Sequence, residues 1–440
     1  MAVCASLGHV AASSPDALGF SLLYTAASEY DTLAWLQGRE RFPGGAQAFI
    51  QRGNQRRLLV SGFAASADPT VSFDGTNVLF AGKKQAADRW QIYEVPVKGG
   101  EARRVITCKE DCVRPFYLPE DRIVYARKVA GRYVIEATPR TGGPPLRLTY
   151  ALGNFLPTDV LRDGRVLFEG AFPLGARSSM ELYTVYSDGS GVESYRCDHG
   201  RARHSGKEVD SGDVVFVSNR GLARFTSALA HEAEIPVPAG EYAGDVAELP
   251  SGEWLLSWRP DSQHRFQLRR WQPGSNALKP VDAIADGNVI QPLPITPRPI
   301  PNRHPSGLHN YNYANLLCLN AYTSKYPLAP ASIASVRLYT QLETGHEKLL
   351  GSATVEGDGS FYLRIPADQP VKIELLDRSG RTLKRESGWF WMRKGEQRVC
   401  VGCHAGPETA PENSVPAVLL RSINPADMTG TATVTPKGAH

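Results

Sequence analysis

Several features that would place this chain of 440 residues in a well-known class are missing from it. It has no run of 18 or more apolar residues, so the sequence predicts no transmembrane segment. It has no Lys/Arg-rich run with interleaved aromatic residues, and its net charge is only +4, which argues against nucleic-acid binding. The signatures G-x-S-x-G and H-E-x-x-H are also absent, so no hydrolase of either type is indicated.

Methionine and cysteine are scarce, whereas glycine (41) and proline (32) are plentiful and suit a fold of short strands and many turns. The N-terminal segment 1–19 lacks a basic region and a full apolar core. Its AVCASLGHVAASS stretch nevertheless resembles the end of a secretory signal whose start is missing or truncated. A frayed terminus is the alternative interpretation.

Two of the seven cysteines belong to a short motif near the C-terminus, and the other five are scattered along the chain. Cys108 and Cys112, in CKEDC, are close enough for a small disulfide loop. Cys4, Cys197 and Cys318 have no obvious mates, and we expect buried thiols at Cys197 and Cys318.

A repeat runs through the first two thirds of the chain. Each unit has a polar turn with Asp or Ser followed by an alternating apolar strand, at a spacing of roughly 40–48 residues, which is typical of a four-stranded propeller blade. The units are VSFDGTNVLFAG (71–82), YLPEDRIVYAR (117–127), VLRDGRVLFEG (160–170), VDSGDVVFVSN (209–219) and LPSGEWLLSWR (249–259).

The repeat resembles TolB-type propeller repeats, and it predicts an all-β N-terminal propeller over residues 20–290. We expect six blades, one of them closed by both ends of the domain, with five or seven left open. A β-sandwich with unrelated hairpins is the alternative. A propeller is a platform on which many functions occur, so the repeat alone indicates none of them.

The last third predicts a second domain. Residues 291–305 hold six prolines, which favour an extended linker. Residues 306–398 alternate apolar and polar side chains between turns, and this predicts a small antiparallel β-sandwich-like domain. Residues 399–440 follow as a C-terminal segment that carries the most informative motif.

That motif is Cys400-Val401-Gly402-Cys403-His404, a C-x-x-C-H. In c-type cytochromes the two thiols bind the haem vinyl groups covalently, and the histidine is the proximal ligand of the iron. The motif therefore predicts one covalent haem c on Cys400 and Cys403, with His404 on the iron. A small residue such as Gly402 would let the loop lie close to the porphyrin.

Two other readings of the motif remain open. A structural zinc site would need a further ligand, for which Cys318, His304 or His309 are candidates, although no second C-x-x-C exists. A thiol redox pair is the other, but such pairs belong to a βαβ setting, whereas this one follows a β domain.

The surrounding sequence resembles the haem-bearing region of hydrazine synthase alpha-subunit-like proteins. The matching residues are Trp389, Gly395, Glu396, Arg398, Cys400, Gly402, Cys403 and His404. The segment 317–320 also resembles that family, and the likeness covers roughly 290–415 well. It implies a propeller joined to a haem-bearing β domain, and it would give Cys318 a second metal site by analogy.

The chain also departs from this family. The resemblance implies two c haems and a tyrosine shortly after the proximal histidine, whereas this chain has one C-x-x-C-H and no tyrosine after Cys403. Glu408 and Glu412 are the nearest oxygen ligands. The family enzyme needs partner subunits, so hydrazine synthesis is not implied for this chain by itself.

The sixth iron ligand decides between electron transfer and small-molecule chemistry. His309 and Met392 are the first candidates, with His304 and Met428 behind them. Trp389, Phe390 and Trp391 are expected to pack on the haem or in the sandwich core. Arg393, Lys394 and Arg398 are candidates for the haem propionates, with plain surface charge as the simpler alternative.

We therefore expect an exported monohaem c-type protein with a redox role, located in the periplasm or secreted. Its partner would be a redox protein or a small inorganic substrate, and a hetero-oligomer could form through the propeller. The alternative is a propeller binding module whose second domain is held by zinc and performs no redox chemistry.

Overall fold

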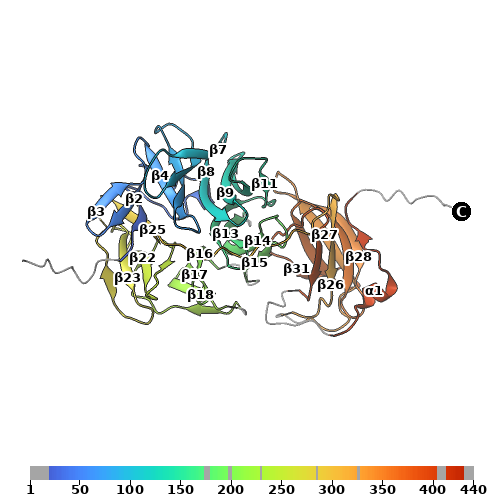
Figure 1. The fold of residues 1–440 in the computed structure, drawn as a ribbon. Coiled ribbons are helices and arrows are strands. Elements are labelled where there is room, and N and C mark those ends of the chain that lie inside the picture. The colour runs from blue at the N-terminus through green and yellow to red at the C-terminus, as the bar shows by residue number, and fades with distance from the viewer. Residues whose placement is uncertain are drawn as a thin grey trace, which may run out of the picture.

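The structure is a computed structural model, and it describes residues 19–172, 179–196, 201–227, 230–283, 286–324, 328–403 and 413–430. Two lobes make up the molecule, and Figure 1 shows the larger, blue-to-yellow lobe beside the smaller, orange-to-red one. Both lobes are built almost wholly of strands. Within the described ranges, no helix is long and apolar enough to cross a membrane.

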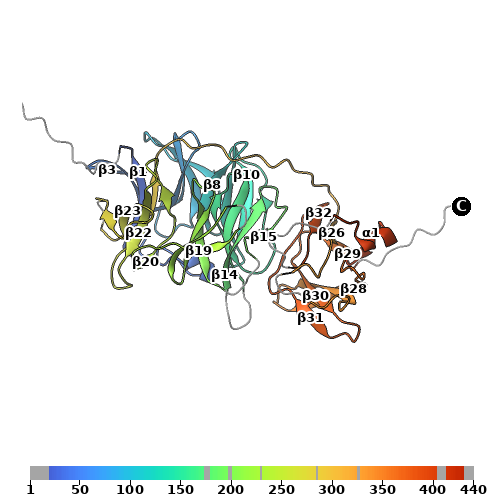
Figure 2. The ribbon, with the colours of Figure 1, turned by 90° about the horizontal axis from the view of Figure 1, so that it is seen from below.

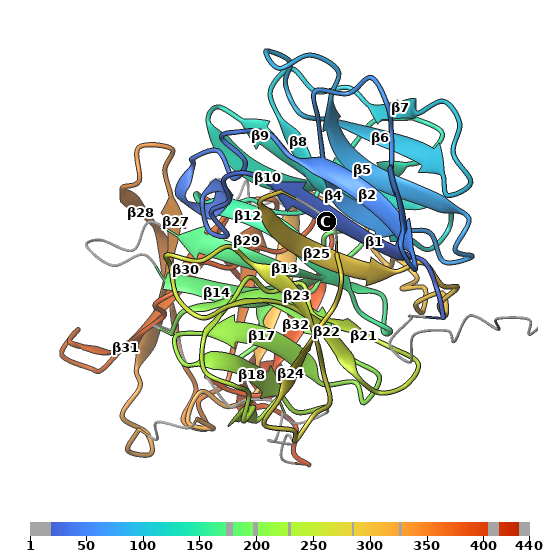
Figure 3. The same ribbon diagram turned by 90° about the vertical axis from the view of Figure 1, so that its left-hand side faces the viewer.

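The larger lobe is a propeller of six antiparallel sheets, which confirms the expected architecture and blade number. Its first three sheets follow one another in the chain, and Figure 3 views them from the propeller end of the molecule. The first sheet has strands β1 (Leu22–Ala27), β2 (Gln47–Arg52), β3 (Gln55–Leu58) and β25 (Asn288–Pro294). The second has β4 (Ala65–Val71), β5 (Asn77–Lys83), β6 (Gln91–Pro96) and β7 (Arg103–Ile106). The third has β8 (Cys112–Leu118), β9 (Arg122–Val129), β10 (Arg132–Pro139) and β11 (Leu146–Arg147).

Three more sheets complete the ring. The fourth has β12 (Asn154–Val160), β13 (Arg165–Phe172), β14 (Ser179–Tyr186) and β15 (Glu193–Ser194), and the fifth β16 (Arg203–Glu208), β17 (Val214–Ser218), β18 (Gly221–Phe225) and β19 (Glu232–Glu234). The sixth has β20 (Glu241–Tyr242), β21 (Ala247–Glu248), β22 (Trp254–Arg259), β23 (Gln267–Trp271) and β24 (Leu278–Pro280). The five repeat units of the sequence thus fall one to a blade in blades two to six.

The propeller closes where the two ends of the domain pair. β25 is the innermost strand of the first blade and runs antiparallel to β1, with Leu22 opposite Pro294. The range expected as linker therefore starts inside β25, which ends at Pro294, and the Ile295 N–H still donates to the Ser21 carbonyl at 2.8 Å before the chain crosses over. The prolines of β25 are tolerated because an innermost strand has one edge without a ladder, so a missing N–H there breaks no hydrogen bond.

Buried charges occupy the axis of the propeller. Arg114 donates a bidentate pair of hydrogen bonds to Asp245 at 3.2 and 3.0 Å, and its backbone N–H donates to Asp68 at 3.1 Å. Arg41 adds contacts to Asp68 (4.0 Å) and Glu169 (3.7 Å). Asp68 and Arg114 come from the innermost strands β4 and β8, Glu169 from β13, and Asp245 from the connection between β20 and β21. Arg41 comes from the 28–45 segment, which holds the short 3-10 turn η1 (Trp35–Gln37). The network ties most of the blades together at their centre.

The smaller lobe is a β-sandwich of two four-stranded sheets around its own apolar core. One sheet has β26 (Tyr313–Cys318), β29 (Phe361–Pro366), β32 (Gln397–Cys400) and β33 (Ala426–Asp427), and the other β27 (Ser335–Gln341), β28 (Glu347–Thr354), β30 (Val371–Leu376) and β31 (Thr382–Arg385). A single short helix, α1 (Ala417–Arg421), is described near the C-terminus.

The first sandwich sheet differs from the expected antiparallel one because it is mixed. β32 pairs with β26 in parallel, and β33 pairs with β29 in parallel. The segment 399–440 is expected to lie outside the sandwich, but it supplies β33 and the end of β32, and Met428 is 1% exposed in the core. Strands far apart in sequence can pair in this way because the intervening loops cross over the sheet.

The crossing segment 295–305 is in contact with the propeller. Figure 2 shows it as an extended trace that leads to the sandwich. Its backbone N–H groups donate to propeller turns, Arg298 to Phe73 at 2.8 Å and Asn302 to Arg162 at 2.7 Å. Further along, the His304 ring stacks on Tyr186 with centroids 3.7 Å apart. The linker thus has a defined path across one face of the propeller.

Candidate functional site

The two thiols of the C-x-x-C-H motif sit at the end of a sandwich strand. Cys400 is the last residue of β32, and the parallel register with β26 places Cys318 directly beside it. Cys403 follows after a short bend and is, like Cys400, half-buried. The strand pairing therefore fixes the start of the motif, while the bend sets its end.

Cys318 forms a third thiol beside the motif. Its side chain is buried, at 2% exposure, and interacts with Cys403. A hydrogen bond with the Cys403 thiol, together with burial, raises the pKa of Cys318 well above its ordinary value, so this thiol stays protonated. A buried thiol was expected here from the sequence. Its position against both motif cysteines was not, because the two segments lie some eighty residues apart.

Gly402 is required by the protein itself. A Cβ atom there would lie 2.1 Å from the carbonyl oxygen of Thr323 and 2.8 Å from that of Asn320. Backbone atoms cannot move aside for a side chain, so the loop between the cysteines can lie this close to the β26–β27 connection only with glycine. The expected reason for a small residue was approach to a porphyrin, and this contact gives a second, local reason.

Both thiols open into a cavity of about 820 Å³ between the propeller and the sandwich. Pockets of this size hold cofactor-sized ligands. The propeller wall comes from blades four and five, with Leu161, Asp163, Arg165, Tyr183, Tyr186, Val192, Glu193, Tyr195, Arg196 and Glu208 among its residues. The sandwich wall includes Leu316, Cys318, Phe361, Ile373, Leu375, Lys384, Glu386, Trp389, Phe390, Arg398, Val399, Cys400 and Cys403.

The wall of this cavity combines aromatic and aliphatic surface with a few basic groups. Burial raises the pKa of Tyr195 to about 12, so its hydroxyl stays a proton donor at neutral pH. Lys384 donates from Nζ to the carbonyl of Cys403 at 3.2 Å and to Ser324 Oγ at 2.6 Å. The lysine therefore holds the end of the thiol loop and is itself part of the cavity wall.

Several residues of the predicted family motif hold the two lobes together. Glu396 accepts from the Gly191 N–H of the β14–β15 hairpin at 3.1 Å and from the Arg393 N–H at 2.7 Å. Arg398 donates to the Val192 carbonyl at 3.1 Å. Gly395, with a positive φ of 70°, lies so close to His309 that a Cβ would meet its backbone nitrogen at 2.7 Å.

The three aromatic residues before the motif divide between two tasks. Trp389 and Phe390 line the cavity, whereas Trp391 is fully buried against the propeller. Its indole N–H donates to the Leu148 carbonyl at 3.0 Å. Trp389 and Phe390 are thus placed where a haem could contact them, whereas Trp391 packs in a core. Of the predicted propionate partners, Arg398 lines the cavity and Arg393 pairs with Asp368 at the lobe interface.

Some predicted site residues lie outside the described part of the chain. These are His404, Glu408 and Glu412, together with Cys4 and Cys197. Cys108 and Cys112 form the expected disulfide, with their Cα atoms 6.1 Å apart, in the propeller and away from the cavity.

The candidate sixth ligands do not belong to the cavity wall. Met392 and Met428 are buried in the sandwich core, at 0% and 1% exposure. His309 lies beside Gly395 and Tyr311, and His304 stacks on the far side of Tyr186 near Asp188. Their role on the iron stays a prediction. Among the described residues, no group of three or more His, Cys, Asp or Glu side chains is arranged to hold a metal ion.

Sequence reasoning missed the propeller side of the cavity. Tyr183, Tyr186 and Tyr195 belong to a strand and hairpin whose pattern only indicated a blade. Lys384 lies in β31, in a charged stretch with no motif of its own. No local signal distinguishes these residues, because they reach the site only through the docking of one lobe on the other.

A family model agrees with the sandwich and its motif. The hydrazine synthase alpha subunit middle domain matches residues 335–405, which hold most of the sandwich and the Cys400–Cys403 thiols. This chain resembles the hydrazine synthase alpha subunit. The match confirms the resemblance expected from the sequence around the motif, and it ends just beyond the C-x-x-C-H.

Comparison with solved structures extends the likeness to both lobes. The hydrazine synthase of Kuenenia stuttgartiensis is 16% identical, covers 91% of this chain and 71% of its own, and superposes with a TM-score of 0.79. TolB from Acinetobacter baumannii is 14% identical, covers 63% of this chain and 67% of its own, and has a TM-score of 0.48. A search of curated protein sequences gives no match. The fold of propeller plus sandwich is thus shared with the first of these structures.

Proposed function

We propose that this protein is an exported monohaem c-type protein with a redox role, carrying its haem on Cys400 and Cys403. The observation that supports the proposal is the position of both thiols in the wall of the 820 Å³ cavity between the lobes. A covalent haem needs two thiols at this spacing, an apolar enclosure for the ring and an axial ligand next in sequence. The chain offers the first two, and His404 follows Cys403.

The residues around the cavity fit such a group. Aromatic and aliphatic side chains from both lobes would cover the ring faces, with Trp389 and Phe390 on the sandwich side. Lys384, Arg398 and Arg165 carry positive charge in the cavity wall that haem propionates could share. Arg165 already pairs with Asp163 and Glu193, and Arg398 already pairs with Glu396. When bound, the haem would supply a one-electron centre or an iron that binds a small molecule. The protein's own residues would exclude water and hold the thiol loop.

Two consequences follow from a covalent haem. Thioether formation takes place outside the bacterial cytoplasm, so we expect the protein in the periplasm or secreted. Its resemblance to a family that works with partner subunits supports a redox partner protein or a small inorganic substrate, and assembly into a hetero-oligomer through the propeller.

A second candidate rests on Cys318. Three thiols, those of Cys318, Cys400 and Cys403, gather at one corner of the cavity, and thiolates are the preferred ligands of structural zinc. On this view the sandwich is held by a metal with His404 as a further ligand, and the propeller acts as a binding module. Binding zinc there would require these thiols to lose their protons to the metal, which makes the affinity of such a site depend on pH.

The test is expression in a bacterium with a cytochrome c maturation system, followed by a pyridine-haemochrome spectrum and metal analysis of the purified protein. We expect one covalent haem per chain and no stoichiometric zinc. Cys400→Ser or Cys403→Ser should leave a single-thioether spectrum, and the double variant should lose covalent haem. Cys318→Ser is the matched thiol control and should keep it. A haem-free protein with one zinc per chain would overturn the proposal in favour of the second candidate.

Added carbon monoxide distinguishes the two redox roles. A reduced spectrum that carbon monoxide does not change would indicate a saturated iron and electron transfer. A shifted spectrum would indicate an open position and chemistry on a small molecule.

A further inference from the structure

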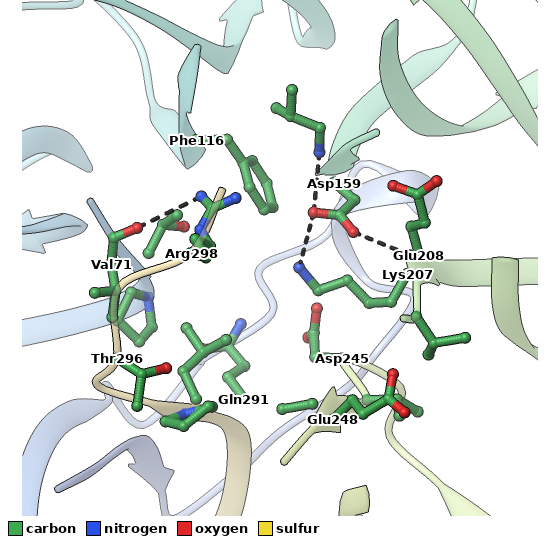
Figure 4. Close-up of a pocket in the computed structure, with 18 of the residues that line it drawn as sticks. Val71, Phe116, Asp159, Lys207, Glu208, Asp245, Glu248, Gln291, Thr296 and Arg298 are labelled. Carbon is green, nitrogen blue, oxygen red and sulfur yellow. Dashed lines mark hydrogen bonds and ion pairs between the residues drawn. The ribbon is translucent and has the colours of Figure 1, made fainter. Parts of the chain in front are cut away.

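A second cavity, of about 320 Å³, lies at one mouth of the propeller channel. Its wall is formed by the inner ends of the blades, and the linker residues 296–301 pass along its edge, as Figure 4 shows. It is separate from the thiol cavity, with Glu208 the one residue common to both walls. Nothing in the proposed redox role uses this second cavity.

Arg298 gives the cavity a cationic side. The guanidinium stacks over the Phe73 ring at 4.4 Å and reaches the Val71 carbonyl only at 3.5 Å, the limit for a hydrogen bond. No carboxylate among the described residues lies within ion-pair distance of it. Burial lowers the pKa of Arg298 and the more distant Asp159 carboxylate opposes this only in part, so a bound anion would further stabilise the charge. Arg114, deeper in the channel, is by contrast fully engaged with Asp245.

Lys207 adds a second cation next to the same space. Its Nζ donates to Asp159 at 3.3 Å and lies 5.1 Å from the centre of the Phe116 ring. An ammonium group has three N–H donors, and Asp159 accepts from one of them. Figure 4 shows Arg298 across the cavity from the Asp159–Lys207 pair, with Phe116 above both.

The opposite side of the cavity is anionic. Glu248 accepts the Asp210 N–H at 2.5 Å and Glu208 accepts the Arg162 N–H at 2.7 Å, so each carboxylate caps the turn of the preceding blade with one oxygen. No basic side chain among the described residues lies within ion-pair distance of either. Burial raises the pKa of Glu208, and the nearby Asp159 carboxylate adds to this, although the Arg162 N–H and guanidinium oppose the shift. Figure 4 places both acids on the side away from Arg298.

We propose that this cavity binds a small zwitterion, a free amino acid or ω-amino acid, with its carboxylate at Arg298 and its ammonium group at Glu248 and Glu208. A plain anion would meet the two uncompensated carboxylates, and a plain amine would leave Arg298 without a partner. A ligand with both charges satisfies both sides at once, because it matches the polarity of the cavity from end to end. This site is independent of haem at the thiol cavity.

The test is isothermal titration of the purified full chain with glycine, 4-aminobutanoate and 6-aminohexanoate, beside acetate and butylamine as single-charge probes. We expect at least one amino acid to bind more tightly than both single-charge probes. Arg298→Gln should weaken that binding about tenfold or more, the loss of one charge-assisted hydrogen bond. Glu248→Gln should weaken it similarly and should not change the haem spectrum.

The controls are Arg378→Gln and Glu343→Gln, two exposed turn residues of the sandwich, which should bind as the wild type does. Circular dichroism of each variant would check that its sheets are kept. The proposal is overturned if no amino acid in the series binds, if acetate or butylamine binds as tightly as the best amino acid, or if folded Arg298→Gln retains wild-type affinity.

Discussion

At the scale of single residues, Arg114 carries the largest expected effect on stability. Its guanidinium is buried and lies between Asp245, at 3.0 Å, and Asp68, at 3.9 Å, which come from different blades. The pKa of Asp68 is raised by burial despite its contacts with Arg114 and Arg41, which shows how much this carboxylate depends on its cationic partners. The arginine therefore compensates two carboxylates that are removed from water.

Removing that charge should destabilise the propeller strongly. Arg114→Met removes the ion-pair partner of the buried Asp245 and leaves Asp68 with Arg41 alone, so we expect a loss of about 3–5 kcal/mol in the free energy of unfolding. Urea denaturation followed by circular dichroism measures it, and Arg378→Met, on the sandwich surface, should change the value by less than about 0.5 kcal/mol. A folded Arg114→Met protein as stable as the control variant would contradict this account of the channel.

At the scale of elements, the β14–β15 hairpin connects the propeller with both the linker and the sandwich. Asp188 in its turn accepts from the Ser190 N–H at 2.9 Å and from Ser190 Oγ at 2.6 Å, and its carbonyl accepts from Arg393. Burial alone would raise the pKa of Asp188, but the hydrogen bonds from Ser190 outweigh it and hold the pKa below its ordinary value. The hairpin turn is thus stabilised by an ionised carboxylate.

This carboxylate predicts a pH dependence with a definite sign. Because the folded pKa lies below the unfolded one, the contribution of Asp188 is complete above about pH 5 and is lost as the pH falls below about 4. The free-energy difference between wild type and Asp188→Asn should therefore shrink between pH 5 and 3. Urea unfolding at half-unit pH steps measures it, with Glu343→Gln as the control. A free-energy difference that stays constant or grows as the pH falls would contradict this role of Asp188.

At the scale of the whole molecule, the two lobes share an apolar cluster. Trp391 of the sandwich packs with Phe155 and Tyr150 of the propeller, at ring distances of 6.1 and 6.4 Å. Arg393, Glu396 and Arg398 add polar contacts around it. A cavity for a cofactor can persist between two lobes only if such an interface holds them in one arrangement.

Loss of the central indole should separate the unfolding of the lobes. Trp391→Ala is expected to cost about 3–5 kcal/mol, as for other large-to-small core changes, and to split one calorimetric transition into two. Trp258→Ala, on blade six, alters the propeller without touching the interface and should keep a single transition. A single, unshifted transition for Trp391→Ala would show that the interface contributes little.

Local sequence patterns determined much of this protein. The Asp- and Ser-containing turns with alternating strands predicted blades two to six, because tight hairpins need residues that accept positive φ and because a half-buried strand alternates every second residue. The C-x-x-C-H motif and its Trp-to-His surroundings likewise predicted the resemblance to the hydrazine synthase alpha subunit, which the family match over residues 335–405 confirms.

Only the tertiary structure decided which distant residues share a site. Parallel pairing put Cys318 beside Cys400, the docked hairpin brought Tyr186 and Tyr195 to the thiols, and the linker carried Arg298 to the channel mouth. None of these placements leaves a periodic signal, because each depends on long-range contacts between segments whose own patterns are satisfied locally. The sequence therefore determined the elements and the thiols, and packing between the lobes determined the cavity around them.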